Sequence, residues 1–431
     1  MSRLVHVVGA GLAGLAAAVQ AQRRGARVVL HESAPRAGGR SRSYFDAKLG
    51  MTVDNGCHLL LSGDHATLGF LRAISSADNV SGPTQADYPF FDAASGQAWA
   101  IRMTPGRLPR WIFDAEARLP GTQPADYLPM LPLFFGKPGR TVEESMRARG
   151  RVWDSLARPL LRTLLKADPS EASATVASHL LRETLAAGGQ ACRPLIAKNG
   201  VAHAFVEPAL RLLQYGGADI RLGARATNIR FSGTDSKERV SSLAFEGAGE
   251  SVALGPGDGV VLAVPPDAAR ALVPEIVAPD EFRAIVTVHF AVDAPVGSIG
   301  SIGSERLTFF VNGAADWLCA GDGRLTATIV SADRLLSTPH EEIAAAAWRD
   351  VAKAVRLPPV PMPPWQVIAE ERATFATVPS QEGLRAATRT RWPNLTLAGD
   401  WTATDLPATI EGAIRSGQKA ADALLNPSME R

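Results

Sequence analysis

The sequence lacks the features of several common classes of protein, because it has few cysteines, little net charge and no long apolar run. Its 431 residues include three cysteines, an odd and scattered set that predicts neither a disulfide framework nor a metal site. The formal net charge is +2, which argues against nucleic acid as the main partner. No apolar run is long enough to span a bilayer, since the run after Arg3 is a glycine turn with its helix. We therefore expect a cytoplasmic protein with reduced thiols, either soluble or bound to a membrane surface.

A glycine turn between two predicted strands stands at the N-terminus. Residues 4–8 form an apolar run, the turn follows at 9–14, and a helix then leads to a second strand that ends at Glu32. This spacing is typical of a dinucleotide-binding unit, in which the pyrophosphate lies at the N-terminus of the helix. Glu32 is placed to bind a ribose hydroxyl, and its charge would repel a 2′-phosphate. The other predicted contacts are Gly9, Gly11, Leu12, Ala13 and Gly14.

A second glycine motif directly after Glu32 indicates which dinucleotide is bound. Gly38 and Gly39 allow the backbone to approach a phosphate, and Arg40 can bind it as a fork. The motif resembles the second flavin signature of the amine oxidase and phytoene desaturase superfamily. We therefore predict FAD rather than NAD as the cofactor.

A third motif lies near the C-terminus. Residues 395–397 form a short predicted strand, and residues 407–417 open the last helix. Asp400 can bind the ribityl or phosphate region, while the helix beginning near Thr409 would point its amides at the flavin ring. The predicted contacts here are Gly399, Asp400, Thr409, Ile410, Gly412 and Ala413.

Longer stretches resemble one group within this superfamily, the hydroxysqualene dehydroxylases of hopanoid biosynthesis, also described as squalene-associated FAD-dependent desaturases. The likeness covers nearly the whole chain, and its most specific stretches are residues 54–61, 371–375, 397–402 and 406–413. In the superfamily the first of these passes close to the flavin, which implies cofactor contacts at Asn55 and Gly56. Cys57 and Asp405 depart from the group's pattern, which has glutamine and glycine at these positions.

The resemblance implies an α/β fold with a discontinuous Rossmann-like FAD-binding domain, a mixed-sheet substrate domain and a helical, partly apolar cap. The FAD-binding domain resumes mid-chain in the superfamily, where Ala226 lies near the adenine. Residues 219–222 and 226–229 are predicted to be short strands paired with each other. The expected division is residues 1–92, 191–270 and 386–431 for FAD binding, 93–190 for a substrate-domain strand with the cap, and 271–385 for the mixed sheet.

The resemblance also implies the chemistry. Reduced FAD would deliver hydride to the carbon that bears the hydroxyl of hydroxysqualene, water would leave, and squalene would form. This reaction needs a proton donor for the leaving hydroxyl, for which His58 and His289 are the candidates. A lone histidine is also commonly a hydrogen-bonded structural residue, so both roles stay open.

The cap also contains the segment that we expect to meet a membrane. Residues 102–166 interleave prolines and large apolar side chains with more basic than acidic residues. Most of these apolar side chains are expected to pack on the main body, and part of the cap to dip into the headgroup layer of the inner membrane surface. The substrate would be extracted there or handed over by upstream squalene-pathway enzymes.

Other functions share parts of these patterns. A carotenoid-type desaturase would have the same cofactor motifs and run the flavin in the opposite direction. A monoamine oxidase commonly carries a lysine on a substrate-domain strand, and residues 285–292 contain none. A flavin-bound lipid carrier without turnover would also suit the apolar cap.

Overall fold

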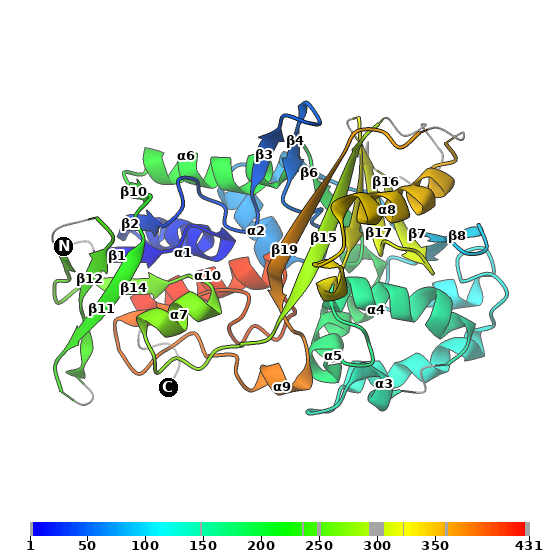
Figure 1. The fold of residues 1–431 in the computed structure, drawn as a ribbon. Coiled ribbons are helices and arrows are strands. Elements are labelled where there is room, and N and C mark those ends of the chain that lie inside the picture. The colour runs from blue at the N-terminus through cyan, green and yellow to red at the C-terminus, as the bar shows by residue number, and fades with distance from the viewer. Residues whose placement is uncertain are drawn as a thin grey trace.

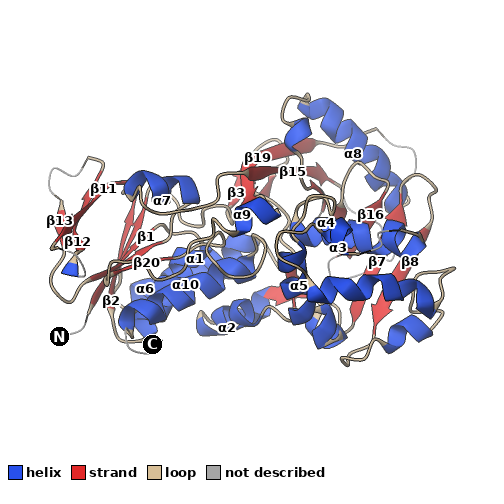
Figure 2. Ribbon diagram, turned by 90° about the horizontal axis from the view of Figure 1, so that it is seen from below, coloured by secondary structure: helices blue, strands red, loops and turns tan. Residues whose placement is uncertain are grey.

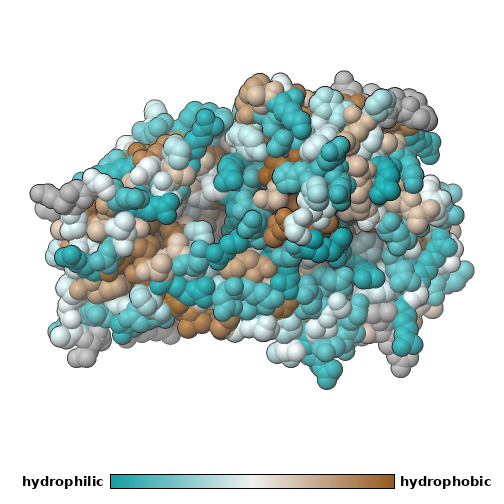
Figure 3. Space-filling view, in the orientation of Figure 1, coloured by the Kyte–Doolittle hydropathy of each residue, from teal (hydrophilic) through white to brown (hydrophobic). Residues whose placement is uncertain are grey.

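The computed structural model describes residues 3–146, 149–234, 237–247, 251–292, 306–321, 323–357 and 361–426. It confirms the predicted α/β class, with a parallel sheet at one end of an elongated molecule and a mixed sheet at the other (Figure 1). On the face drawn in Figure 3, hydrophobic and hydrophilic residues are interspersed. No helix within the described ranges is long and apolar enough to cross a bilayer.

The parallel sheet brings together the beginning, the middle and the end of the chain. Its strand order is β10-β2-β1-β14-β20, and its strands are Asp219–Leu222, Arg27–Glu32, Leu4–Val8, Gly259–Leu262 and Leu395–Leu397. Strand β14 reads Gly-Val-Val-Leu and is buried at every position, as expected for a parallel strand covered on both faces. All these strands run parallel, so their carboxyl ends meet at one edge.

The alternation of side chains along β14 decides which layer each residue meets. Val261 packs toward helices α1 (Leu12–Arg23) and α10 (Ile410–Leu425), which lie side by side in Figure 1. Val260 and Leu262 point to the other face, which is covered by α7 (Pro266–Leu272) and an antiparallel sheet. That sheet has the order β11-β12-β13, with strands Ala226–Ser232, Arg239–Phe245 and Val252–Ala253.

One predicted strand pairing is wrong. We expected residues 219–222 and 226–229 to pair with each other, but β10 pairs parallel with β2, and β11 pairs antiparallel with β12. Strand β2 would otherwise leave an open edge, and β10 covers it, so the turn between the two segments connects two sheets.

The mixed sheet forms the other end of the molecule. Its order is β19-β15-β18-β17-β16-β7-β8, with strands Trp365–Phe375, Phe282–Ala291, Arg324–Ile329, Trp317–Gly321, Arg306–Val311, Ala86–Asp92 and Ala98–Met103. Helix α8 (His340–Ala354) covers one face through its apolar stripe. The cap packs on the opposite face, as Figures 1 and 2 show from two directions.

The cap is built mainly of short helical pieces. They are η2 (Arg110–Phe113), η3 (Pro124–Phe135), α3 (Val142–Ser145), η4 (Trp153–Ala157), α4 (Arg158–Leu165) and α5 (Ala174–Glu183). Pro129 and Pro132 lie inside η3, and each lacks the backbone N–H and crowds the preceding turn, which disfavours a regular α-helix there. Buried Leu133 anchors η3 to the rest of the cap.

Smaller elements connect the two ends of the molecule. Strands β3 (Ser43–Asp46) and β4 (Met51–Asp54) form a hairpin, and β9 (Pro194–Ala197) pairs with β5 (Leu60–Leu61) and β6 (Val80–Ser81). Further helices of the described residues are α2 (His65–Ala73), α6 (Glu207–Tyr215) and α9 (Pro379–Glu382). The division into domains given above remains a prediction.

Candidate functional site

The first glycine turn lies at the carboxyl edge of the parallel sheet, between β1 and α1. Gly9 has φ of +104°, and a Cβ there would lie 2.4 Å from the carbonyl oxygen of Ala263, which follows β14. A Cβ at Gly14 would lie 1.8 Å from the carbonyl oxygen of Gly9. Both positions therefore require glycine, the first for the turn and the second for the close contact between helix and strand.

Gly11 differs from its neighbours because a Cβ there would meet no described atom within 4 Å. It is also the N-cap of α1 and has no side chain to bond with the first amides of the helix, which no intrahelical carbonyl can reach. The second motif lies alongside, since the Gly38 amide donates to the carbonyl of Ala10 at 2.8 Å. A Cβ at Gly39 would lie 3.3 Å from the Gly11 Cα. Open amides within a cradle of glycines fit a pyrophosphate.

The acid at the end of β2 orders the loops around it. The Glu32 carboxylate accepts hydrogen bonds from the amides of Ala10 at 2.7 Å and Ala34 at 2.8 Å. The Ala224 amide donates to the backbone carbonyl of Glu32 at 2.7 Å, which brings the segment that begins β11 at Ala226 to the same corner. Glu32, the first turn and Ala226 thus share one end of the candidate cofactor site.

The second and third motifs contact each other directly. The Arg40 guanidinium forms an ion pair with Asp400 at 2.7 Å and also donates to the carbonyl of Ala373 at 2.7 Å. This ion pair raises the pKa of Arg40 above its usual value. Arg385 donates to the Asp400 carbonyl at 3.0 Å, and burial lowers the pKa of Arg385 to about 10. Residues predicted separately at Arg40 and Asp400 therefore form a single charged cluster.

The last helix begins where the sequence predicts. Thr409 is the N-cap of α10, and its hydroxyl accepts a hydrogen bond from the Gly412 amide at 3.0 Å. The Gly399 amide donates to the Ser416 hydroxyl at 2.8 Å, which ties the loop after β20 to the same helix. Ile410 and Ala413 lie in the first turn of α10, beside this loop.

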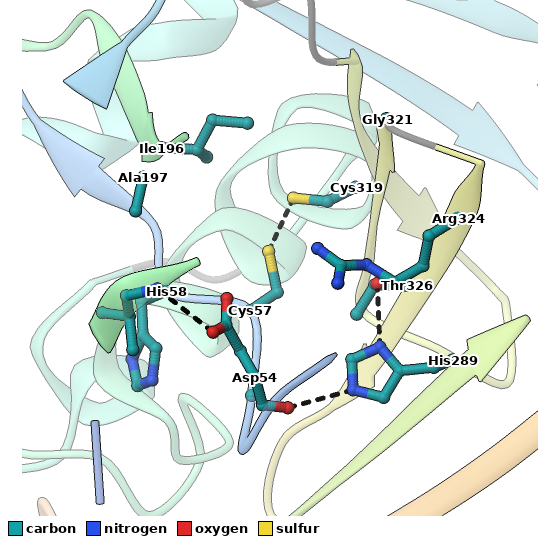
Figure 4. Close-up of a pocket in the computed structure, with 12 residues that line it drawn as sticks. Asp54, Cys57, His58, Ile196, Ala197, His289, Cys319, Gly321, Arg324 and Thr326 are labelled. Carbon is teal, nitrogen blue, oxygen red and sulfur yellow. Dashed lines mark hydrogen bonds between the residues drawn. The ribbon is translucent and has the colours of Figure 1, made fainter. Parts of the chain in front are cut away.

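A pocket lies where the loop after β4 meets the mixed sheet, and Figure 4 shows its lining. It has about 480 Å³ of empty space, part of it open to solvent. The lining residues are Asp54, Gly56, Cys57, His58, Ile196, Ala197, Val201, His289, Cys319, Gly321, Arg324 and Thr326. Asn55 lies next to it and donates from its side-chain amide to Glu370 at 3.0 Å.

Both candidate histidines line this pocket, with different surroundings. The His289 Nε2 lies 3.1 Å from the Asp54 carbonyl, so it carries the proton, and Nδ1 accepts from the Thr326 hydroxyl at 3.0 Å. Burial lowers the pKa of His289 to about 4, with Arg324 adding to the effect. His58 has a buried Nε2 with no hydrogen-bond partner among the described residues, and burial lowers its pKa as well. Both imidazoles are therefore neutral at neutral pH.

Lys166 belongs to the same electrostatic environment, although it carries no motif that would identify it in the sequence. It is a partly buried residue at the C-terminus of α4, with left-handed backbone at φ of +56°. Burial lowers its pKa to about 8, while the charges of Asp400 and Asp64 oppose this and Arg40 adds to it. Burial also raises the pKa of the Asp64 carboxyl to about 7. Lys166 is thus protonated at neutral pH yet able to release its proton just above it.

The two positions that depart from the group's pattern have visible structural consequences. The Cys57 thiol lies 2.7 Å from the sulfur of Cys319 on β17, although 262 residues separate them in the sequence. Asp405 has φ of +62°, a left-handed conformation that favours glycine and that aspartate tolerates better than most residues. Its side chain is exposed, 3.8 Å from Nδ1 of His179.

Comparison with known proteins decides the family. The model of the flavin-containing amine oxidoreductases matches residues 12–425. The chain belongs to this family, in the group of the hydroxysqualene dehydroxylases. It is 44% identical to a protein of that name from Rhodopseudomonas palustris, over 99% of both chains. A protein of the same name from Zymomonas mobilis is 38% identical over 99% of this chain and all of that one. A probable zeta-carotene desaturase from Synechococcus elongatus is 23% identical over 98% of both chains.

Solved structures agree with the fold of a flavin-containing amine oxidoreductase. An oxidoreductase from Methanosarcina mazei has a TM-score of 0.71 at 14% identity, covering 97% of this chain and all of that one. Putrescine oxidase bound to putrescine has a TM-score of 0.67 at 15% identity, covering 99% of both chains. The predicted FAD cofactor and the classification as an oxidoreductase are confirmed by the family.

Proposed function

We propose that this protein removes the hydroxyl group of hydroxysqualene, or of a similar long isoprenoid alcohol, by FAD-dependent reduction, which gives squalene from hydroxysqualene. The observation that carries the proposal is the likeness, over 99% of the chain, to proteins named for this reaction. The cofactor cradle described above suits the chemistry, because reduced FAD when bound supplies the hydride.

The residues that would hold FAD follow from the geometry of the cradle. The open amides at the start of α1, with Gly38 and Gly39 beside them, would bind the pyrophosphate. Glu32 would bind the ribose and Ala226 would lie near the adenine, while Asp400 and the N-terminus of α10 would lie toward the ribityl chain and the flavin ring. Asn55 and Gly56 would border the flavin from the pocket side.

The proton for the leaving hydroxyl would come from Lys166, with His58 as the second candidate. A donor must hold its proton at neutral pH and release it readily, and the pKa of Lys166 at about 8 meets both needs. His58 is neutral and His289 uses both ring nitrogens within the protein. His289 would therefore position the Asp54 loop.

The test of the function uses the FAD-loaded protein without oxygen. The flavin is reduced chemically, hydroxysqualene is added, and flavin absorbance and extracted lipid are followed together. Reoxidation of the flavin matched by squalene supports the proposal. A flavin that stays reduced, with no squalene formed, overturns it.

A carotenoid-type desaturase is the second candidate, because the chain also resembles a probable zeta-carotene desaturase. That reaction takes hydride from the isoprenoid, so it would begin from oxidised flavin. Phytoene that bleaches oxidised flavin and gains double bonds would favour this function over the first.

Contact with a membrane is supported by a set of exposed apolar side chains on the cap. On η2 and η3, Phe113 is 70%, Leu128 60%, Leu131 53% and Phe135 77% exposed. Exposed basic residues lie nearby in the chain at Arg107, Arg110, Lys137 and Arg140, and the last two line a groove with Phe135. Apolar side chains next to cations suit an anionic lipid surface, from which the substrate would enter or be handed over by an upstream enzyme.

We expect the triple substitution of Leu128, Leu131 and Phe135 by serine to weaken binding to anionic vesicles at least about tenfold. Each buried apolar side chain contributes roughly 1.5 kcal/mol or more, and a tenfold change corresponds to about 1.4 kcal/mol. Vesicle flotation measures the effect. Leu336→Ser is the matched control, since Leu336 is 42% exposed but lies outside the cap. Equal binding by the triple variant and the wild type would exclude this surface.

A further inference from the structure

The geometry points to a disulfide-forming site in the candidate pocket: we propose that Cys57 and Cys319 are joined reversibly by peroxide, and that the bond locks the loop carrying Cys57 so that the pocket wall cannot move aside for a ligand. The proposal concerns the thiols and does not depend on which isoprenoid the protein binds. Only its effect on turnover rests on the proposed function.

The first argument is the approach of the two sulfurs. They lie 2.7 Å apart, and a disulfide needs about 2.05 Å, so a small movement of one side chain brings them to bonding distance. They come from separate elements, the loop after β4 and strand β17 (Figure 4). Their contact is therefore a product of the tertiary fold and would tie two parts of the pocket wall together.

The second argument is access. Cys57 is partly exposed and lines the pocket, whereas Cys319 behind it is 7% exposed. In Figure 4 the Arg324 guanidinium points toward this pair, with its Nη1 donating to the Thr52 carbonyl at 2.8 Å. An oxidant entering the pocket would meet Cys57 first, beside a fixed positive charge.

The third argument is the third cysteine, which serves as an internal comparison. Cys192 is 1% exposed, and burial raises the pKa of its thiol to about 12. A protonated and enclosed thiol is inert toward peroxide. Oxidation is therefore expected to be confined to the pair in the pocket.

The chemistry balances with hydrogen peroxide as the oxidant. The Cys57 sulfur attacks peroxide to give a sulfenic acid and one water. The Cys319 sulfur then displaces the second water to form the disulfide. The two thiols lose two electrons and two protons, and peroxide is reduced to two waters. A reduced flavin that reacts with dioxygen gives hydrogen peroxide, so a flavin bound beside this pocket would supply the oxidant.

The bond would act on ligand binding through the loop that carries Cys57. This loop also holds His58 and the predicted cofactor contacts Asn55 and Gly56. Fixing it to β17 would hold the pocket wall in the position that the structure shows, and a dithiol reductant would release it.

The experiment treats the FAD-loaded protein with hydrogen peroxide and counts thiols after unfolding. The wild type is expected to fall from three thiols to one and to recover all three with dithiothreitol. Peptide mapping should find Cys57 joined to Cys319. Cys192→Ala should still lose two thiols, while Cys57→Gln and Cys319→Ala should not form the bond. The Cys57→Gln variant carries the group's own residue, and its flavin absorbance reports that it is folded.

The same samples are assayed for turnover of hydroxysqualene, and the rate after peroxide treatment is divided by the rate before it. The wild type should lose most of its turnover with peroxide and regain it with dithiothreitol, whereas the ratio for Cys57→Gln should not change. Three thiols remaining in the treated wild type, or Cys57 found as a sulfinic acid beside unreacted Cys319, would overturn the site. A disulfide that leaves turnover unchanged would overturn the proposed effect of the bond on ligand binding. If the untreated protein turns over no hydroxysqualene, the proposed function fails while the thiol count still tests the site.

Discussion

Replacing Gly11 with alanine is expected to strip FAD from a protein that still folds. Gly11 has φ of −71° and ψ of 179°, which any residue adopts, and an added Cβ meets no described atom within 4 Å. The methyl group would instead occupy the space in front of the first amides of α1, where the pyrophosphate is proposed to lie. Losing charge-assisted hydrogen bonds there costs roughly 2.7 kcal/mol, which is about 100-fold in affinity.

Flavin absorbance gives the FAD content of this variant, and thermal unfolding of the FAD-free protein gives its stability. Gly257→Ala is the matched control, since Gly257 also has open space around it but lies at the amino end of β14, away from the cofactor edge. Gly14→Ala should lose stability and FAD together, because its Cβ would collide with the Gly9 carbonyl. Normal FAD affinity in the Gly11 variant would mean that the pyrophosphate binds elsewhere.

Replacing Lys166 with methionine is expected to lower squalene formation by at least about 100-fold, the usual contribution of a general acid. Burial lowers the pKa of Lys166 to about 8, so in the wild type the donor form is present below that pH and turnover falls as the pH rises through it. In the variant this alkaline limb should be absent. Lys166→Arg keeps the charge but holds its proton too tightly to donate it, so it should be as slow as the methionine variant.

Stability gives a second measure of the lowered pKa of Lys166 that does not depend on turnover. The folded protein binds the Lys166 proton less tightly than the unfolded chain, whose lysine has a pKa of 10.5. Stability therefore rises with pH between about 8 and 10.5, and Lys166→Met should be more stable than the wild type at neutral pH. A variant that keeps the alkaline limb near pH 8 would exclude Lys166 as the donor and leave His58 to be tested by His58→Gln.

The parts of this site that are encoded locally could be predicted from the sequence, and those created by packing could not. Gly9, Gly11 and Gly14 have a fixed spacing because one turn and one helix impose it, so the cradle could be recognised before the fold. Lys166 follows an ordinary apolar helix, and only the docking of the cap brings it near Asp400. No local pattern could indicate that contact.

Three further features show where prediction from the sequence ends. The resemblance implies a glycine at position 405, and the left-handed backbone of Asp405 gives a physical reason for it that the sequence alone did not predict. The pairing of residues 219–222 was missed because nearness in the chain suggested a hairpin, while the free edge of β2 decided the partner. Cys57 and Cys319 met for the same reason, through the assembly of distant segments.

The strand order of the parallel sheet determines when the sheet can be completed during synthesis of the chain. Strand β1 pairs with β14, and β14 with β20, which is made only at residues 395–397. Helix α10, which follows β20 in the chain, packs so closely on α1 that a Cβ at Gly417 would lie 2.0 Å from the Ala13 carbonyl oxygen. The parallel sheet and the contact between α1 and α10 therefore form only after residues 395–425 have been synthesised, and we expect a chain truncated before α10 not to retain a flavin.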